Sequence, residues 1–480
     1  MKYDVAIIGA GVVGALTARA LSRYQCRVVL LEAADDVAGG ASRANSGIVH
    51  GGFDPKPGTK KAELNVRGAA MMPSLCRDLG VRYRPNGSLV LGFDSDDLNA
   101  LISLFERGKQ NGVPGLSLLS SDEVRQIESA ISPAVRGALL CESAGIVCPY
   151  GLTIAAAGNA MDNGAELRTN FPVDRVDLLP DGFRLHAGDA WIEASYVVNC
   201  AGLFADRIAA MIGDRRFTVI PKKGEYMLLD RSAGQICRHT LFQVPSAAGK
   251  GVLVSPTADG NLLIGPTSVA IEDRTCRDTT TEGLAAVRTA AAKTIPDLPY
   301  RDVITSFTGL RASLAGEEDF VLCESSVSPC FVHAMGIDSP GLSSAPAIAE
   351  ELLSLLRRAG LKTEEKPGFC PTRPSYHRFA DAAEEEKNAV IAKEPAYGHI
   401  ICRCESVSEG EILDAIHRNP PARSLDAVKR RVRAGMGRCQ GGFCSTYVTE
   451  LLARESGSDM NAVTKFGAGS ELLFQGEGER

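Results

Sequence analysis

The chain has 480 residues, of which 45% are hydrophobic, and carries a formal net charge of −6. This length suggests two or three domains, and the mildly acidic balance argues against nucleic acid or an anionic membrane as the main partner. The sequence contains no apolar run of about 20 residues and no secretion signal, so we expect a cytoplasmic protein without an integral membrane segment. Its fourteen cysteines then favour thiols or metal ligands over disulfides.

The first strand and turn are typical of a dinucleotide-binding unit. A Val- and Ile-rich stretch, residues 3–8, leads into Gly9, Gly11 and Gly14, and a second strand ends in Glu32. In this fingerprint the first glycine permits a tight turn, the second a close approach of the backbone to a pyrophosphate, and the third close packing of helix on strand. The helix N-terminus faces the phosphates, and the acid after the second strand accepts a hydrogen bond from a ribose 2′-hydroxyl. These four residues therefore predict a bound dinucleotide.

The same pattern of strand, glycine turn and helix occurs three times, at residues 5–20, 197–212 and 331–357. Between the repeats, residues 98–131 are predicted to form two helices, and residues 216–310 are rich in strands. We therefore expect an α/β fold in which a Rossmann-like domain is interrupted by an α+β domain with a mostly antiparallel sheet, followed by a small helical C-terminal domain.

The expected boundaries follow from these patterns and from a charged, Pro- and Gly-containing linker. They are 1–80, 145–215 and 326–360 for the discontinuous dinucleotide domain, 81–144 and 216–325 for the substrate domain, 361–372 for the linker, 373–458 for the C-terminal domain, and 459–480 for a polar tail.

Four cysteines near the C-terminus are clustered: Cys402, Cys404, Cys439 and Cys444. Their spacing, C-x-C-x34-C-x4-C, predicts a four-thiolate site for either zinc or an iron–sulfur cluster. Structural zinc pairs favour about two to four intervening residues, so the tight first pair favours a cluster. The basic run at residues 429–433 is either a solvated helix face or a surface that offsets an anionic cluster or docks an acidic partner.

Residues 401–445 resemble the small 2Fe-2S domain of the bacterioferritin-associated-ferredoxin type, and all four cysteines map onto its ligands. The resemblance implies a 2Fe-2S cluster held by these four side chains.

Residues 1–357 resemble the D-amino-acid-oxidase-like FAD superfamily, through the glycines and Glu32 above and through residues 199–206 and 336–348. The resemblance implies bound FAD and transfer of a hydride from a substrate C–H bond to flavin N5. The residues expected to contact FAD are Gly9, Gly11, Gly14, Glu32, Ala41, Ser42, Asn45, Ser46, Gly47, Val173, Ala201, Gly202, Gly336, Ile337, Ser339, Gly341 and Leu342.

Two branches of the superfamily are most similar: the large subunit of anaerobic glycerol-3-phosphate dehydrogenase and L-2-hydroxyglutarate oxidase. Residues 41–50, 223–226 and 307–311 are similar to both, and the turn at 41–46 is more like the hydroxyglutarate branch. A C-terminal 2Fe-2S domain is found in the glycerol-3-phosphate relatives and fits an oxidase poorly. The resemblance thus implies a dehydrogenase for sn-glycerol 3-phosphate first and L-2-hydroxyglutarate second. An amine or imino-acid dehydrogenase subunit and a non-catalytic electron-transfer or docking subunit remain alternatives.

An anionic substrate requires fixed cations and a proton acceptor. Arg311 suits a carboxylate or phosphate because its guanidinium binds in a bidentate manner; the alternative is a structural salt bridge. Lys223 would add a point charge near the flavin, and His50 would take the hydroxyl proton unless it is a structural histidine. Electrons are expected to leave through the cluster to a partner protein or a quinone-linked acceptor, which would also allow peripheral membrane association.

Overall fold

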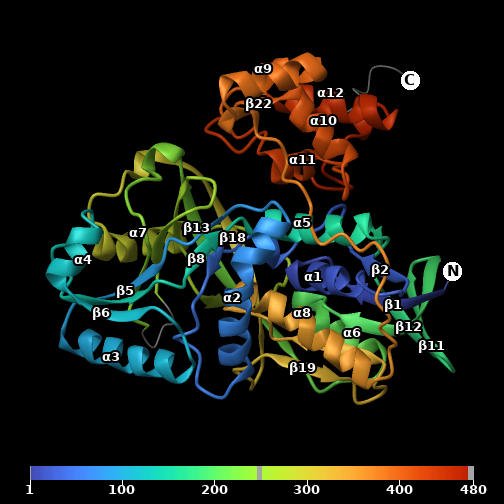
Figure 1. Cartoon of the computed structure of the whole chain (residues 1–480), viewed down its shortest axis with the longest axis horizontal. Helices are drawn as coiled ribbons and strands as arrows, with labels where there is room; N and C mark the ends of the chain where they lie inside the picture. Colours follow the sequence, from blue (N-terminus) through green and yellow to red (C-terminus); the bar gives the residue numbers. More distant parts are fainter. Residues whose placement is uncertain (1, 246–250, 474–480) are drawn as a thin grey trace.

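The structure, a computed structural model, describes residues 2–245 and 251–473. Figure 1 shows two bodies that each contain a sheet, with a smaller helical C-terminal part lying above α5. This arrangement confirms the predicted α/β fold class with a helical C-terminal addition.

The first body is built on an eight-stranded sheet in the order β10-β11-β12-β1-β2-β9, in which β20 also pairs with β12, and β19 with β20. Strand β1 runs parallel to β12 and β2, and β20 runs parallel to β12. The carboxyl ends of these strands therefore meet at one edge, where α/β sheets bind their ligands. The strands are β1 (Lys2–Ile8), β2 (Val28–Leu31), β9 (Glu166–Arg168), β10 (Arg175–Leu179), β11 (Gly182–Ala187), β12 (Ala190–Asn199), β19 (Val321–Glu324) and β20 (Phe331–Met335).

Helices cover this sheet, and three of them follow β1, β12 and β20 as the repeated sequence pattern predicts. The helices are α1 (Val12–Leu21), α2 (Lys60–Asp78), α5 (Pro149–Asp162), α6 (Ala205–Met211) and α8 (Gly341–Arg358). The α1 helix packs against both α5 and α8, because its small residues Ala15 and Ala18 are fully buried and allow close approach. Burial of larger side chains such as Leu352 and Leu356 of α8 stabilises the layer by about 1.5–3 kcal/mol for each residue.

The second body contains a nine-stranded sheet, mostly antiparallel as predicted, with β14 and β5 as a parallel pair. Its longest strands, β13 and β18, pair with each other along most of their length. The strands are β5 (Ser88–Gly92), β6 (Leu116–Ser120), β7 (Gly137–Cys141), β13 (Val219–Leu229), β14 (Thr240–Gln243), β15 (Leu253–Pro256), β16 (Leu262–Gly265), β17 (Val269–Ala270) and β18 (Val303–Leu314). The helices are α3 (Ser95–Gln110), α4 (Ser121–Ile127) and α7 (Thr281–Thr294), and a separate small sheet joins β3 (Ile48–Val49), β4 (Tyr83–Arg84) and β8 (Gly145–Val147).

The C-terminal part has its own apolar core, which includes Ile412, Ile416, Val428 and Leu451. A capping box starts α10, because Ser408 and Glu411 each bind the backbone N–H of the other. The elements are α9 (Glu384–Lys393), β21 (Ile400–Cys402), β22 (Val407–Ser408), α10 (Glu409–His417), α11 (Leu425–Val432) and α12 (Ser445–Ser456).

The C-terminal part is held on the first body by one buried carboxylate in the loop after β2. Asp36 accepts hydrogen bonds from Arg430 (2.7 Å) and Arg431 (2.8 Å), and Ser424 donates to the neighbouring Asp35 (2.6 Å). The two guanidinium groups hold the pKa of Asp36 below its usual range. Breaking a buried pair of this kind typically costs about 3–5 kcal/mol.

The three arginines of the basic run at residues 429–433 are buried and paired within the chain, which corrects the interpretations of the run as a solvated helix face and as a docking surface for an acidic partner. Arg430, Arg431 and Arg433 are all buried, and Arg433 pairs with Glu405 and with Asp259 of the second body. The acids that it meets belong to the same chain.

The predictions for residues 98–131 and for the C-terminal tail are correct only in part. Residues 98–131 do form two helices, but α3 begins at Ser95, α4 ends at Ile127, and the strand β6 lies between them. In the predicted tail, residues 459–480, a short 3-10 helix covers Met460–Ala462, and the last seven residues lie outside the described range.

Candidate active site

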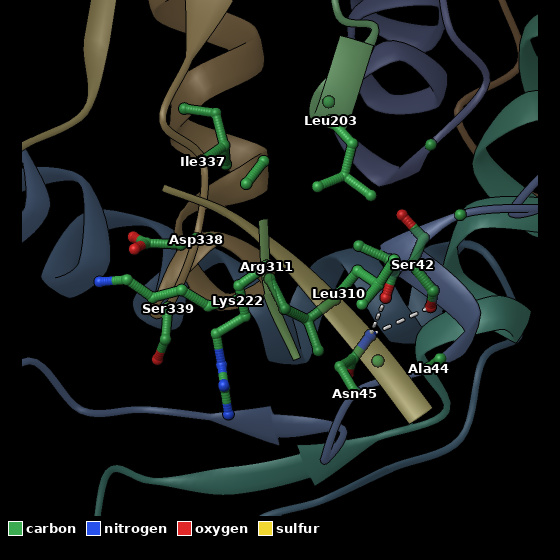
Figure 2. Close-up of a pocket in the computed structure, with 18 of the residues that line it drawn as sticks. Ser42, Ala44, Asn45, Leu203, Lys222, Leu310, Arg311, Ile337, Asp338 and Ser339 are labelled. Carbon is green, nitrogen blue, oxygen red and sulfur yellow. Dashed lines mark hydrogen bonds between the residues drawn. The ribbon is translucent and has the colours of Figure 1, made fainter. Parts of the chain in front are cut away.

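A cavity of about 1660 Å³ opens between the two sheet-containing bodies. It extends from the turn after β1 to the paired strands β13 and β18. Figure 2 shows Lys222, Arg311, Asp338 and Ser339 gathered on one side of it, with Ser42, Ala44 and Asn45 on the other. Fourteen of the seventeen residues expected to contact FAD line this cavity, and Gly14, Gly47 and Gly336 do not.

The turn after β1 has the geometry that its glycines require. Gly9 adopts a φ of +101°, and a Cβ there would lie 2.5 Å from the carbonyl oxygen of Cys200. A Cβ on Gly14 would lie 2.0 Å from the carbonyl oxygen of Gly9, so Gly14 serves the packing of α1 on β1 rather than contact with a ligand. The backbone N–H of Val12, in the first turn of α1, donates to Ser42 Oγ (2.8 Å).

Glu32 stands at the carboxyl end of β2 with its carboxylate fixed by backbone donors. The N–H of Ala10 binds Oε2 at 2.8 Å, and the N–H of Ala34 binds Oε1 at 3.0 Å. Burial raises the pKa of Glu32. The carboxylate lines the cavity beside the glycine turn, where a ribose hydroxyl could donate to it.

Two glycines in the cavity wall leave free space beside the backbone, which a flat cofactor would need. A Cβ added to Gly40 or Gly202 would meet no atom within 4 Å, and both residues line the cavity. Together with the glycine turn and Glu32, this free volume fits a dinucleotide.

The loop that carries Ser42 and Asn45 is rigid and lies close to β18. Asn45 donates to the carbonyl oxygens of Ala41 (3.0 Å) and Ser42 (3.1 Å), as Figure 2 shows, and accepts from the N–H of Gly47 (2.9 Å). A Cβ on Gly309 would lie 2.0 Å from the carbonyl oxygen of Ala44, so β18 must have glycine here.

Two cations face the cavity from neighbouring strands. Lys222 on β13 and Arg311 on β18 are cross-strand partners, and both line the cavity. Arg311 donates weakly to the carbonyl oxygen of Thr267 (3.4 Å), and within the described residues neither cation forms an ion pair with a carboxylate. Like charges directly opposite each other on a sheet repel, so this pair favours an anionic ligand between them.

The structure corrects the prediction for Lys223. Its ammonium group pairs with Glu225 Oε1 at 2.9 Å and is buried on the face of β13 that points away from the cavity. Side chains alternate between the two faces of a strand, so Lys222 shares a face with Tyr226, and Lys223 does not. The same alternation could have identified Lys222 from the sequence.

His50 lies in the cavity wall as predicted, with its ring stacked on Phe242 at 5.6 Å between centroids. Its backbone N–H donates to Ser343 Oγ (2.8 Å), which fixes the residue at the end of β3. The imidazole is thus placed on the same cavity as the cation pair.

The sequence analysis also missed Lys61 and Asp338 on the cavity wall. They form an ion pair at 2.7 Å, and Ser313 donates to the second oxygen of Asp338 at 2.8 Å. Lys61 comes from α2 and Asp338 from the turn before α8, so no local pattern in the sequence connects them.

The four clustered cysteines form two pairs in the C-terminal part. Cys404 Sγ lies 3.6 Å from Cys439 Sγ, and Cys402 pairs with Cys444, whose thiol lowers the pKa of Cys402 to about 6. Backbone N–H groups of residues 441–443 also point at the sulfur of Cys439 and lower its pKa.

The four thiols suit a 2Fe-2S cluster. A 2Fe-2S cluster takes four thiolates shared between two irons, and two thiol pairs supply them.

The model of the FAD dependent oxidoreductase family matches residues 4–355. The chain belongs to this family.

A second model, that of the BFD-like 2Fe-2S binding domain, matches residues 400–454. This oxidoreductase therefore uses FAD together with a 2Fe-2S cluster. None of the helices in the described ranges is long and apolar enough to cross a membrane.

Three relatives are informative. The chain is 46% identical to the glycerol 3-phosphate dehydrogenase of Caloramator mitchellensis, over 98% of both chains. It is 32% identical to human mitochondrial L-2-hydroxyglutarate dehydrogenase, over 56% of this chain and 61% of that protein. Among solved structures, the L-α-glycerophosphate oxidase of Mycoplasma pneumoniae with FAD bound matches with a TM-score of 0.75 and 28% identity, over 78% of this chain and 99% of that one.

Two glycines of the β1 turn allow a test of the FAD site. We expect Gly14→Ala to destabilise the fold by about 1–3 kcal/mol through overpacking, because the new Cβ would strike the Gly9 carbonyl. Gly11→Ala should keep the melting temperature of the flavin-free protein, since its Cβ would meet only Ser42 Oγ at 3.2 Å. It should weaken FAD binding about tenfold or more, or about 1.4 kcal/mol. Thermal unfolding and the ratio of flavin to protein measure the two effects. Equal flavin content in wild type and Gly11→Ala would contradict the placement of the pyrophosphate.

Proposed function

We propose that this FAD-dependent oxidoreductase oxidises sn-glycerol 3-phosphate to dihydroxyacetone phosphate and releases the electrons by way of its 2Fe-2S part. The observation that carries the proposal is the pair of cations at Lys222 and Arg311 on the cavity wall. The relative that matches 98% of the chain is itself a glycerol 3-phosphate dehydrogenase, which supports the choice of substrate.

The cation pair suits a phosphate group in particular. A phosphate monoester carries nearly two negative charges and offers three acceptor oxygens, so one group can meet both side chains. The guanidinium of Arg311 would bind it in a bidentate manner, and Lys222 would contribute a point charge.

The remaining chemistry requires a proton acceptor and the two cofactors. Oxidation removes a hydride from C2 of the substrate and a proton from its hydroxyl oxygen. When bound, FAD supplies the hydride acceptor and the 2Fe-2S cluster supplies a one-electron carrier. His50 lines the same cavity as the cation pair, and we assign it the role of taking the hydroxyl proton.

Two other substrate classes are less well supported. L-2-Hydroxyglutarate has a carboxylate at each end and would need a second cation close to Lys222 and Arg311. Lys61 on the wall is paired with Asp338, although Arg43, Arg207 and Arg277 also line the cavity. A simple amine has no anionic group for these cations, and an imino acid offers one carboxylate, which carries less negative charge than a phosphate monoester.

The electron acceptor is proposed to be a partner protein or a quinone-linked carrier that docks beside the cluster. Phe443, between the cluster ligands Cys439 and Cys444, is 80% exposed, and Tyr447 nearby is 52% exposed. Such aromatic side chains are common in docking surfaces. All fourteen cysteines are free thiols, which supports a reducing compartment such as the cytoplasm, with any membrane association made through the acceptor.

An anaerobic visible spectrum tests this function. We expect sn-glycerol 3-phosphate to bleach both the flavin bands and the broad absorbance of the cluster, and L-2-hydroxyglutarate and amino acids to leave them unchanged on the same timescale. Glycerol serves as a control that lacks the phosphate. Bleaching by L-2-hydroxyglutarate alone would show that the enzyme oxidises that compound instead. Bleaching by glycerol would show that the phosphate group is not needed for substrate recognition.

A further inference from the structure

A second cavity, of about 430 Å³, lies where the C-terminal part meets the two sheet-containing bodies. Its walls come from the end of α2, the start of α5, the segment 373–381, and α11 with the residue that follows it. We propose that this cavity is a binding site for a phosphate group, separate from the substrate site, and that its occupancy fastens the C-terminal part to the rest of the enzyme.

The walls of this cavity are unusually rich in arginine. Two acidic residues, Asp259 and Asp381, line it, and the arginines that do so are Arg77, Arg82, Arg373, Arg378, Arg418, Arg430, Arg431 and Arg433. They come from distant parts of the sequence, so folding brings together guanidinium groups that repel one another.

The acids of the chain compensate this charge only in part. Asp259 is shared by Arg82 (2.7 Å), Arg378 (3.3 Å) and Arg433 (2.9 Å), while one other acid, Asp36, serves both Arg430 and Arg431. Asp381, Asp162 and Glu405 complete the carboxylates that pair with these arginines. Five carboxylates therefore face eight guanidinium groups.

Two of the eight arginines have no carboxylate at all within the described part of the chain. Arg77 has no ion pair, and Arg418 donates to the carbonyl oxygen of Pro374 while its guanidinium lies 4.6 Å from the ring centroid of Tyr376. Burial and the charges of Arg418 and Arg431 lower the pKa of Arg373. Arg77 is exposed and Arg418 is half-buried. The cavity thus has a positive charge that lacks a protein counter-ion among the described residues.

Unused hydrogen-bond donors point to the same conclusion. The Nε of Arg430 is a buried donor with no hydrogen-bond partner among the described residues. The Nε2 of His377, a donor or an acceptor according to its tautomer, is likewise buried and without a partner, and both side chains line the cavity. Arg430 is only 6% exposed. An unpaired buried donor of this kind is costly, and an oxyanion would satisfy it.

Phosphate matches this chemistry best. Its oxygens accept several charge-assisted hydrogen bonds at once, and guanidinium groups bind them in a bidentate manner. The cavity volume lies within the range of ordinary small-molecule sites, about 300–1000 Å³, so either inorganic phosphate or a small phosphate ester fits. Because the walls belong to different parts of the chain, a ligand bound here would stabilise their association.

The experiment uses the full-length holoenzyme with Arg311→Ala, which removes the phosphate-binding cation of the substrate site. Inorganic phosphate and methyl phosphate are titrated separately by calorimetry and by thermal unfolding, with chloride holding the ionic strength constant. We expect saturable binding and a melting temperature that rises with phosphate concentration. Adding Arg418→Gln should weaken binding about tenfold or more. Arg454→Gln, an exposed arginine of α12 outside the cavity, is the matched control and should leave binding unchanged.

The outcomes are distinct. Tighter binding of methyl phosphate than of phosphate identifies a phosphate ester as the natural ligand, and the reverse order identifies inorganic phosphate. No saturable binding, or equal affinity in the Arg418→Gln and Arg454→Gln proteins, overturns the proposal. If Arg418→Gln fails to fold, as judged from its flavin spectrum, Arg77→Gln, which changes another arginine of the cavity, replaces it with the same expected loss. Since the substrate site is disabled throughout, these results do not depend on which compound the enzyme oxidises.

Discussion

Replacing Arg311 with alanine will lower kcat/KM for sn-glycerol 3-phosphate by roughly a hundredfold to ten-thousandfold. The guanidinium group can form two charge-assisted hydrogen bonds to the phosphate, each contributing about 1.5–3 kcal/mol. The rate of flavin reduction after anaerobic mixing with substrate, followed at the flavin absorbance over a range of concentrations, measures the effect directly. The loss should appear mainly in the apparent affinity, because the phosphate on C3 takes no part in the bond changes at C2.

The neighbouring lysines of β13 are a matched pair of controls for this prediction. Lys222→Met should also raise the apparent KM, since Lys222 faces the cavity opposite Arg311. Lys223→Met should leave KM unchanged and instead lower the melting temperature, because it removes the buried partner of Glu225. A larger KM effect from Lys223 than from Lys222 would show that the substrate lies on the other face of the strand.

Replacing Cys439 with serine will abolish turnover with the physiological acceptor while leaving reduction of the flavin by substrate intact. Cys439 and Cys404 lie outside the apolar core of the C-terminal part, whereas Cys402 and Cys444 belong to it, so Cys439→Ser removes a cluster ligand at the smallest cost to folding. Iron and sulfide content, the cluster absorbance, flavin reduction and acceptor-dependent turnover would be measured on the same protein.

The control for this variant is Cys370→Ser, an exposed cysteine outside the two thiol pairs. It should retain the cluster and full turnover. If Cys439→Ser loses the cluster yet turns over with the acceptor at the normal rate, electrons leave directly from the flavin, and the cluster has another role.

The sequence predicted best what is encoded locally. The β1 turn, Glu32 and the three repeats of strand, turn and helix are each set by residues close together in the chain, and their glycines have steric requirements that few other residues meet. The strand β6 was missed because Leu116–Ser120 is short and its side chains do not alternate clearly between polar and apolar.

What could not be predicted depends on contacts between distant segments. The error of one residue at Lys223 reversed the face of the strand, because successive side chains point to opposite faces. The basic run at 429–433 was predicted to be a surface because its partners Asp36 and Asp259 lie far from it in the sequence. No local pattern indicates these contacts. The arginine-lined cavity has the same origin, since its walls are separated by hundreds of residues.

The loop after β2 has a consequence for how the two prosthetic groups enter the protein. Glu32, at the edge of the FAD cavity, and Asp36, which grips Arg430 and Arg431, are separated by three residues. The C-terminal part follows this loop in the chain, and its arginines need Asp36 in its final position in order to dock. We expect bound FAD to order the loop through the neighbouring Glu32. Incorporation of FAD should therefore come before firm docking of the iron–sulfur part, and newly made chains that lack flavin should be the ones cut by proteases within residues 361–372.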